Sequence, residues 1–275
     1  MLTCRRRIAL AIAVVVGPYV AAGAQTVAPT EALSKDAIRR FLTSAPILSH
    51  KDIPKGTTRP TRLTLSDGTL THDAAFSTVD EHVAIMRFQS GRTELDFVDS
   101  YRYTIAAYML AEMLGLDDMM PVTVEREWNH HKGSLTWWVD DVKFDEGQRL
   151  KSKVQAPDPV AWNRQMYRMR VFSQLVADTD RNVGNVLITN DWKLWMIDFT
   201  RAFRRNKQLL SPGDLTNCDR QLLTRLRELT KTDLAGRMKA YVGDAEITAV
   251  LARRDAILAK FDELLARRGE AQVLY

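Results

Sequence analysis

The chain has 275 residues, of which 45% are hydrophobic and 27% are charged, a balance typical of a globular protein with a sizeable buried core. This composition excludes a collagen-like repeat, a coiled coil and a largely disordered chain. The formal net charge of +5 is modest for this length, so composition gives no support for nucleic-acid binding.

The first residues have the layout of a secretory signal. Three arginines at residues 5–7 precede an apolar run that ends at Val16, and small residues follow up to Ala24. We predict a signal peptide over residues 1–24, cleaved after Ala24, and a periplasmic or secreted mature protein. Because the apolar run is short for a bilayer span, we expect no stable membrane span after cleavage. An uncleaved anchor is the alternative.

Cleavage would change both the charge and the cysteine count. The predicted signal holds three arginines and no acidic residue, so the mature net charge falls to +2. Cys4 would leave with it, and Cys218 would be the single cysteine of the mature chain. We therefore expect no intramolecular disulfide, no strongly cationic face and no nucleic-acid partner.

Residues 25–60 are expected to form an N-terminal arm or linker. The stretch Glu31–Leu42 has the apolar spacing of a short helix. The segment after it contains Pro46, Pro54 and Pro60, which is typical of a loop.

Strand patterns dominate residues 61–140. A hairpin is predicted around the turn Asp67-Gly68, because Asp-Gly is a favoured two-residue turn. One helix interrupts the strands, with Gly115 as its stop signal. The predicted elements are the strands Thr61–Leu65, Thr69–Phe76 and His82–Phe88, the helix Tyr101–Leu114, and the strands Val122–Val124 and Ser134–Val139.

Helical patterns dominate residues 141–275. Asp158-Pro159 opens a long amphipathic helix, and a small hairpin follows with its turn at Asn190-Asp191. A strand-rich part followed by a helix-rich part predicts an α+β fold with two lobes, 61–140 and 141–275. The predicted elements after the long helix are the strands Val186–Ile188 and Leu194–Ile197 and the helices Leu222–Leu229, Asp233–Tyr241 and Asp244–Arg268.

The residues that can carry chemistry lie between 178 and 200. Asp180 and Asn185 are five residues apart, and Asp198 follows an apolar strand and precedes Phe199. Phosphoryl transfer needs a carboxylate near the attacking hydroxyl, oxygen ligands for Mg²⁺ and positive groups around the phosphates. Asp and Asn also favour helix ends and turns, which is the alternative for each residue alone. Their joint spacing favours a phosphotransfer site.

These residues resemble the motifs of a known group. Asp180-Arg181-x-x-x-Asn185 and Ile197-Asp198-Phe199 look like the motif pair of phosphatidylinositol kinases, and they are similar to those of HipA-type and secretory-pathway kinases. The resemblance implies an atypical protein-kinase-like fold, with a small antiparallel-sheet N-lobe and a mainly helical C-lobe. It also implies that Asp180 orients or deprotonates the acceptor hydroxyl, while Asn185 and Asp198 hold Mg²⁺ between the phosphates of ATP.

The resemblance is incomplete around the phosphates. Kinases of this kind carry a strand lysine paired with a helix glutamate; here the third predicted strand offers Arg87, and the following helix has only Glu112, near its end. Arg87 is the candidate phosphate-binding residue, although arginine does not replace lysine freely. No glycine-rich loop is present, and Thr200 stands where the family usually has glycine. The resemblance implies a hinge that meets adenine at Trp138, Val139 and Asp140.

A basic cluster follows the Asp198 motif and consists of Arg201, Arg204, Arg205 and Lys207. In kinases this segment faces the acceptor, so the cluster would attract acidic or phosphorylated substrates. A solvated surface is the alternative, and it is the one that charge runs usually favour.

Taken together, the patterns predict an exported Mg-ATP-dependent phosphotransferase. Its acceptor is an unidentified hydroxyl of a protein, a lipid, a sugar or another small molecule. Because the Lys–Glu pair is missing, the alternative is a catalytically weak or inactive kinase-like module that binds a nucleotide or a partner protein.

Overall fold

The computed structural model describes residues 33–53 and 60–275. The predicted signal peptide, residues 1–24, lies outside these ranges, as does the start of the predicted arm. No helix within the described ranges is both long and apolar enough to cross a membrane.

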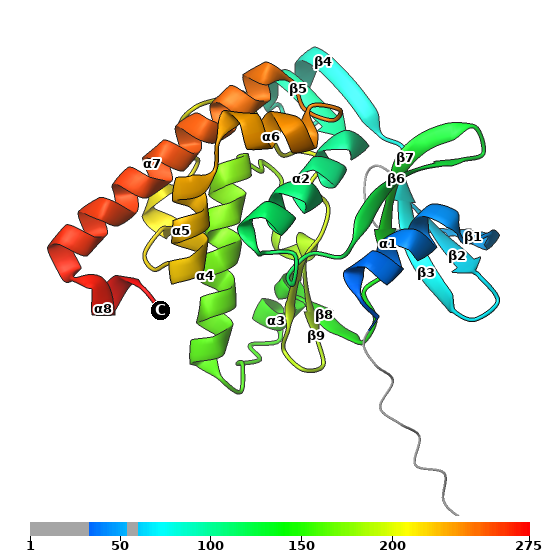
Figure 1. Ribbon diagram of the computed structural model, residues 1–275, viewed down its shortest axis with the longest axis horizontal. Coiled ribbons are helices and arrows are strands. Elements are labelled where there is room, and N and C mark those ends of the chain that lie inside the picture. Colours follow the sequence, from blue (N-terminus) through cyan, green and yellow to red (C-terminus); the bar gives the residue numbers. More distant parts are fainter. Residues whose placement is uncertain (1–32, 54–59) are drawn as a thin grey trace, which may run out of the picture. The chain divides into compact units, whose positions relative to one another are not determined.

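Five antiparallel strands form the main sheet, in the order β1-β2-β3-β7-β6 (Figure 1). Alternation along the strands gives the sheet one apolar face, where Leu63, Ala74 and Leu135 are buried. Thr64 and Asp73 lie on the opposite, polar face. The strands are β1 (Ile47–Asp52), β2 (Thr61–Ser66), β3 (Thr71–Ser77), β6 (Thr123–Trp128) and β7 (His131–Trp137).

Helix α1 (Lys35–Ser44) packs against this sheet at β6 and β7. Ser34 caps its N-terminus, and Phe41 and Leu42 bury its apolar side. Strand β1 follows where a loop was expected, so that expectation was wrong. It is an edge strand with mostly exposed side chains, and its sequence therefore lacks the alternation that marks half-buried strands.

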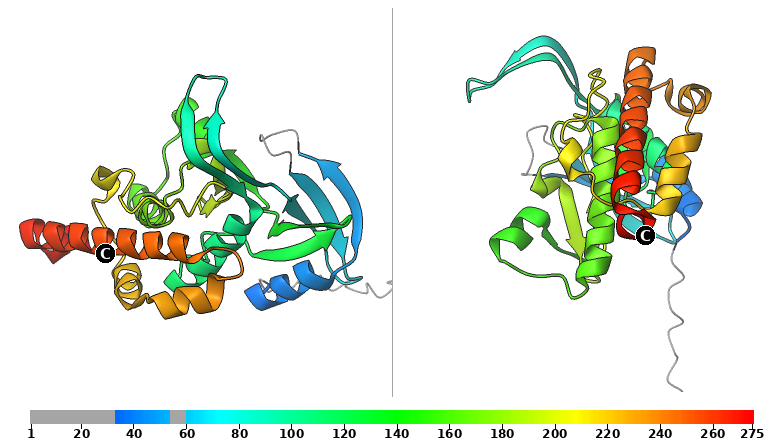
Figure 2. Two further views of the ribbon diagram at one scale, coloured as in Figure 1. Left: turned by 90° about the horizontal axis from the view of Figure 1, so that it is seen from above. Right: turned by 90° about the vertical axis from the view of Figure 1, so that its left-hand side faces the viewer.

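Strands β4 (Asp80–Arg87) and β5 (Thr93–Ser100) pair only with each other and form a separate two-stranded sheet, here called the ribbon. Both views of Figure 2 show the ribbon extending away from the main sheet and the helices. The predicted strand at 82–88 is therefore present, but it does not join the main sheet. Strand β5 was not predicted, because charged residues interrupt its apolar positions.

The ribbon leads directly into helix α2 (Tyr101–Leu114), whose bounds match the prediction. Ser100 caps its N-terminus, and Gly115 ends it with a φ of 65°, a left-handed conformation that glycine adopts without strain. Helix α2 contacts β6 and β7 on one side and α5 and α6 on the other. It therefore links the main sheet to the helical part.

The helical part is built around α4 (Pro159–Val176), which Asp158 caps and which packs along α7 (Asp244–Arg268). A small sheet of order β10-β9-β8 lies beside it, made of β8 (Val142–Asp145), β9 (Val186–Thr189) and β10 (Leu194–Met196). The other elements are α3 (Glu146–Lys151), η1 (Val183–Asn185), η2 (Pro212–Asp214), α5 (Arg220–Glu228), α6 (Lys231–Met238) and α8 (Glu270–Val273).

Candidate functional site

The site begins where α4 ends. Ala177 caps the helix in a left-handed conformation, and the chain turns so that the Asp178 side chain is fully buried. Asp178 accepts a hydrogen bond from the backbone N–H of Asp180 over 3.0 Å. This bond fixes the start of the loop 178–185.

Arg181 ties this loop to the end of β10. Its guanidinium pairs with Asp178 at 2.6 Å. It also donates to the carbonyl oxygens of Asn185 over 2.8 Å, Ile197 over 2.7 Å and Asp198 over 2.9 Å. The side chain is only 9% exposed. One arginine thus holds the loop and the strand end in a fixed relation.

Three predicted site residues meet at this junction. The backbone N–H of Ile197 donates to the carbonyl of Asn185 over 3.1 Å, which places Asp198 beside Asn185. The side-chain amide of Asn185 donates to the carbonyl of Asp180 over 3.0 Å. Asp180 and Asp198 both reach solvent. The structure therefore brings Asp180, Asn185 and Asp198 together, while their catalytic roles stay a prediction.

Asp198 has an unusual backbone and a perturbed carboxyl group. Its φ is 58°, a conformation that costs energy for a residue other than glycine and is common at functional sites. The Thr200 hydroxyl donates to Oδ1 of Asp198 over 3.0 Å. The surrounding protein raises the pKa of the Asp198 carboxyl by burial, although Thr200 and the Arg181 charge oppose this effect. As a residue, Asp198 is nonetheless exposed to solvent.

A fourth acidic residue, which sequence reasoning missed, is Asp99 at the base of the ribbon. The backbone N–H of the next residue, Ser100, donates to the carbonyl of Thr200 over 2.9 Å. Burial and then the Asp198 charge raise the pKa of the Asp99 carboxyl, against a hydrogen bond with the Thr200 side chain. No signal near Asp99 in the sequence indicates this contact.

No protein-family model matches the sequence, and no curated protein matches it. Solved structures do match. The structure of hydra Fam20 has a TM-score of 0.64 at 13% identity, over 87% of this chain and 91% of that chain. The Golgi casein kinase has a TM-score of 0.59 at 14% identity, over 87% and 77% of the two chains. The Helicobacter pylori proinflammatory kinase CtkA has a TM-score of 0.50 at 10% identity, over 83% and 97%.

This chain has an atypical protein-kinase-like fold. The likeness confirms the predicted α+β class, with a small antiparallel-sheet lobe and a mainly helical lobe. At these identities it shows the fold alone.

In this kinase-like fold the predicted hinge lies between β7 and β8. The backbone N–H of Trp138 donates to the carbonyl of Asp73 over 3.1 Å, and the guanidinium of Arg62 lies 4.1 Å from the centre of the Trp138 ring. His72 contacts the carboxylate of Asp140 at 2.7 Å. Val139 lies between these two fixed residues. The role of this segment as a hinge and its contact with adenine stay predictions.

The structure does not bring Arg87 to the other site residues. Arg87 pairs with Thr93 at the far end of the ribbon, six residues along β5 from Asp99, or about 20 Å in an extended strand. The reason is that β4 pairs with β5 instead of adding to the main sheet.

The Lys–Glu pair of kinases is absent from the corresponding elements. Strands β2 and β3 and helix α2 contain no lysine. The acid of α2, Glu112, pairs with Arg39 of α1 and with Arg237 of α6, at 2.9 Å for the latter. Glu112 is therefore engaged away from Asp198.

The basic cluster after Asp198 is mostly paired with acids. Arg201 and Arg204 contact Glu94 of the ribbon at 2.7 and 3.0 Å and are 12% and 11% exposed. Arg205 contacts Glu246 at 2.7 Å and Asp96 at 3.6 Å. Arg201 and Arg204 therefore anchor the ribbon to the segment after Asp198, and neither predicted role describes these two. Arg205 and Lys207 are exposed, as the solvated-surface alternative predicts.

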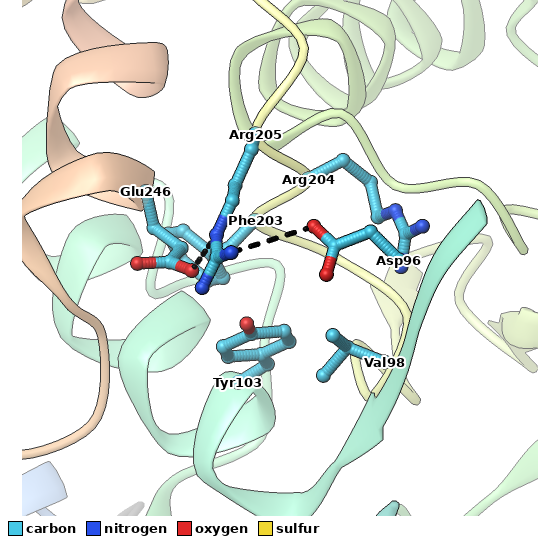
Figure 3. A pocket seen from close by; sticks show the side chains of 7 residues that line it. All are labelled: Asp96, Val98, Tyr103, Phe203, Arg204, Arg205 and Glu246. Carbon is cyan, nitrogen blue, oxygen red and sulfur yellow. Dashed lines mark hydrogen bonds and ion pairs between the residues drawn. The ribbon is translucent and has the colours of Figure 1, made fainter. Parts of the chain in front are cut away.

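Figure 3 shows the junction around Arg205, whose guanidinium lies between the carboxylates of Glu246 and Asp96. A cavity of about 10 Å³ lies there, next to Tyr103 and Phe203, with room for one water molecule. Its lining includes Arg204 and Arg205 of the basic cluster, but no residue predicted to bind the metal, the phosphates or adenine.

The donor set suits a hard divalent cation that also contacts substrate. Across residues 33–53 and 60–275, no three His, Cys, Asp or Glu side chains gather closely enough to hold a metal by themselves. The junction of the loop 178–185 with the end of β10 instead offers the carboxylate of Asp198 and the amide of Asn185. Mg²⁺ is commonly bound by one or two carboxylates together with phosphate oxygens, so these residues fit the predicted ion.

Proposed function

We propose that this protein is an exported, Mg-ATP-dependent phosphotransferase that acts on a hydroxyl acceptor. The observation that carries the proposal is the convergence of Asp180, Asn185 and Asp198 within a kinase-like fold. The predicted signal peptide supports export. The acceptor class stays open between proteins, sugars, lipids and small molecules.

In this proposal each residue has a distinct task. Asp180 is exposed, so its carboxylate is accessible to an acceptor hydroxyl, which it would orient or deprotonate. Asn185 and Asp198 would hold Mg²⁺, which neutralises charge on the phosphates when it is bound. Arg181 keeps the two loops at a fixed separation, and such positioning is a large part of phosphoryl-transfer catalysis.

The nucleotide half of the site has weaker support. The predicted hinge, residues 138–140, lies between β7 and β8, and the Golgi casein kinase has been solved with Mn and ADP bound. However, no lysine of β2, β3 or α2 is available to bind the phosphates. This observation favours the second candidate function, a catalytically weak or inactive module that binds a nucleotide or a partner protein.

Thermal unfolding with and without Mg-ATP tests binding at this site. A ligand that binds the native state raises its stability by mass action, so we expect a metal-dependent rise in the wild type and its loss in Asp198→Ala. Asp214→Ala, which removes an exposed carboxylate elsewhere, is the matched control and should keep the rise. The absence of any shift in the wild type would contradict nucleotide binding.

Turnover separates an enzyme from a binding module. We expect the wild type to release phosphate from ATP or to phosphorylate a hydroxyl acceptor, and Asp180→Asn to lose this activity while it keeps the thermal shift. Binding without turnover in the wild type would favour the second candidate.

A further inference from the structure

Strand β4 forms an open edge of the ribbon. It pairs with β5 on one side, and the ribbon has no third strand among the described residues. Apart from that pairing, no hydrogen bond within the described ranges reaches the backbone of residues 80–87. The edge of β5 differs, because Arg204 donates to the carbonyl of Leu95 over 3.2 Å. Since alternate residues of an edge strand direct their N–H and C=O groups outward, β4 offers free backbone donors and acceptors.

The exposed side chains of β4 are apolar in the middle of the strand and charged towards its ends. Val83 and Ile85 are 38% and 53% exposed, and Leu95, opposite Ile85 on β5, is 70% exposed. Figure 2 shows the ribbon away from the main sheet and the helices. Alternation along a strand places Val83 and Ile85 on one face together with Glu81 and Arg87. This face of β4 therefore runs from an acid through two apolar residues to a base.

Such a pattern is complementary to itself. When two β4 strands pair antiparallel about a two-fold axis at Ala84, residues equally far from Ala84 on its two sides face each other. Val83 then lies opposite Ile85 of the second copy, and Glu81 lies opposite Arg87 of the second copy. The two-fold axis forms each of these pairs twice. Apolar pairs and opposite-charge pairs directly across from each other both stabilise antiparallel sheets.

A comparison with β1 shows that the β4 edge lacks protection. Strand β1, at the edge of the main sheet, carries Lys51 and a shift in register between Ile47 and Ser49. Both features hinder pairing with another chain. Strand β4 contains no lysine and no proline, and its pairing with β5 has no such shift. Its charges lie where self-pairing joins opposite signs, which favours a second copy over an unrelated strand.

We propose that β4 is a dimerisation surface, at which two copies of this chain join their ribbons into one sheet of order β5-β4-β4-β5. The pairing needs no metal, nucleotide or acceptor, so it holds or fails independently of the proposed phosphotransfer. Because one pair of short strands buries less surface than a permanent dimer does, we expect an equilibrium between monomer and dimer.

Sedimentation equilibrium of the full chain at low ionic strength tests the proposal. Protein concentrations of about 1–300 µM cover the range in which small interfaces dissociate, and we expect the wild type to shift from monomer to dimer across it. Glu81→Arg and Arg87→Glu each place like charges opposite each other at both ends of the paired strands. Each variant should therefore weaken association by at least about tenfold.

A mixture of these two variants gives the sharpest test. Glu81→Arg has bases at both charged positions of this face, and Arg87→Glu has acids at both, so a heterodimer of the two regains both opposite-charge pairs. We expect the mixture to associate about as tightly as the wild type, and the double variant Glu81→Arg/Arg87→Glu to do the same. Association through another surface predicts no such recovery, and a parallel pairing of β4 predicts no loss in the single variants.

Two further variants test the apolar pairs. Ile85→Lys places a lysine on the edge opposite Val83 and should abolish association at these concentrations. Leu48→Lys is the matched control, since Leu48 is 64% exposed on the edge strand β1, and it should leave association unchanged. All substituted side chains are exposed, so each variant should unfold at nearly the wild-type temperature.

Two results would refute the proposal. One is a wild type that remains monomeric at the highest concentration, which would leave the β4 edge to an extended segment of a different protein. The other is a dimer that the charge variants and Ile85→Lys leave intact, because such a dimer forms through another surface.

Discussion

At the scale of single residues, Arg181 explains why the site keeps its shape. Its guanidinium joins the buried carboxylate of Asp178 to three backbone carbonyls, and its centre lies 4.1 Å from that of the Phe199 ring. The planar fork of arginine can serve several acceptors at once, which the single ammonium of lysine cannot. The pair Arg181–Asp178 thus holds the backbone segments that carry Asp180 and Asp198 in place.

We predict that Arg181→Lys lowers the free energy of unfolding by about 2–4 kcal/mol, because it leaves buried carbonyls without donors. Urea denaturation measures this loss, and the metal-dependent thermal shift should disappear with it. The control is Arg227→Lys, in an exposed pair with Asp262, which should cost less than about 0.5 kcal/mol. A wild-type thermal shift in Arg181→Lys would show that the two loops hold their relation without the arginine.

At the scale of elements, the ribbon is fastened to the segment after Asp198. Glu94 contacts Arg92, Arg201 and Arg204 at 2.6 to 3.0 Å, and the Arg201 guanidinium lies 4.3 Å from the centre of the Phe97 ring. Isolated two-stranded sheets are marginally stable, so these contacts give the ribbon support. In kinases such a segment is often ordered by arginines that bind a phosphate group; here the carboxylate of Glu94 occupies the arginines.

The stability that Glu94 gains from its contacts with Arg92, Arg201 and Arg204, here called the clamp, should depend on pH. Burial opposes the charge of Glu94, but Arg201 and Arg92 outweigh it and hold the pKa of Glu94 below its ordinary value. A lowered carboxyl pKa stabilises the fold above the unfolded-state pKa, about 4.3, and this contribution is lost as the pH falls through the folded-state value.

We predict that Glu94→Gln destabilises the protein by about 1–3 kcal/mol at pH 7, and that the difference from wild type narrows as the pH falls below about 4. Thermal unfolding across this range measures it, and hydrogen exchange of residues 80–100 shows whether the ribbon loosens. Glu127→Gln, at an exposed position of β6, should show no such trend. A difference that stays constant with pH would mean that the clamp does not depend on the Glu94 charge.

At the scale of the whole molecule, local signals predicted most of the helices and strands and the three candidate site residues that the structure brings together. Helices α2 and α7 match their predicted bounds, because capping residues and periodic apolar faces act within a few residues. The spacing of Asp180 and Asn185 is likewise local. The approach of the ribbon base to Thr200 could not be found this way, since the bond between Ser100 and Thr200 joins positions a hundred residues apart.

Strand pairing was the second feature that could not be predicted from the sequence. A strand pattern at 82–88 does not say which sheet the strand joins. Arg87 was therefore predicted to bind phosphate, although its place in the ribbon holds it far from the other site residues. Strand β1 was missed because an edge strand with exposed side chains has no alternation to detect. Register and neighbour choice depend on tertiary packing, which no short segment encodes.

The segment after Asp198 is also held by a residue distant in the sequence, Arg253 of α7. This arginine is fully buried and donates to the carbonyls of Leu175 over 2.8 Å and Arg204 over 2.7 Å, and to that of Asn206. Burial lowers its pKa to about 10, so it stays charged at neutral pH. It thereby joins the end of α4 to the chain that follows the candidate site.

We predict that Arg253→Met lowers the free energy of unfolding by about 3–5 kcal/mol, because three carbonyls lose a charged donor in the core. Urea denaturation at pH 7 measures the loss. Arg267→Met, on an exposed part of the same helix, should change stability by less than about 0.5 kcal/mol. Replacing a buried charge with an apolar side chain is sometimes stabilising, so a gain in stability would show that the carbonyls find other donors. In that case Arg253 would not hold the segment.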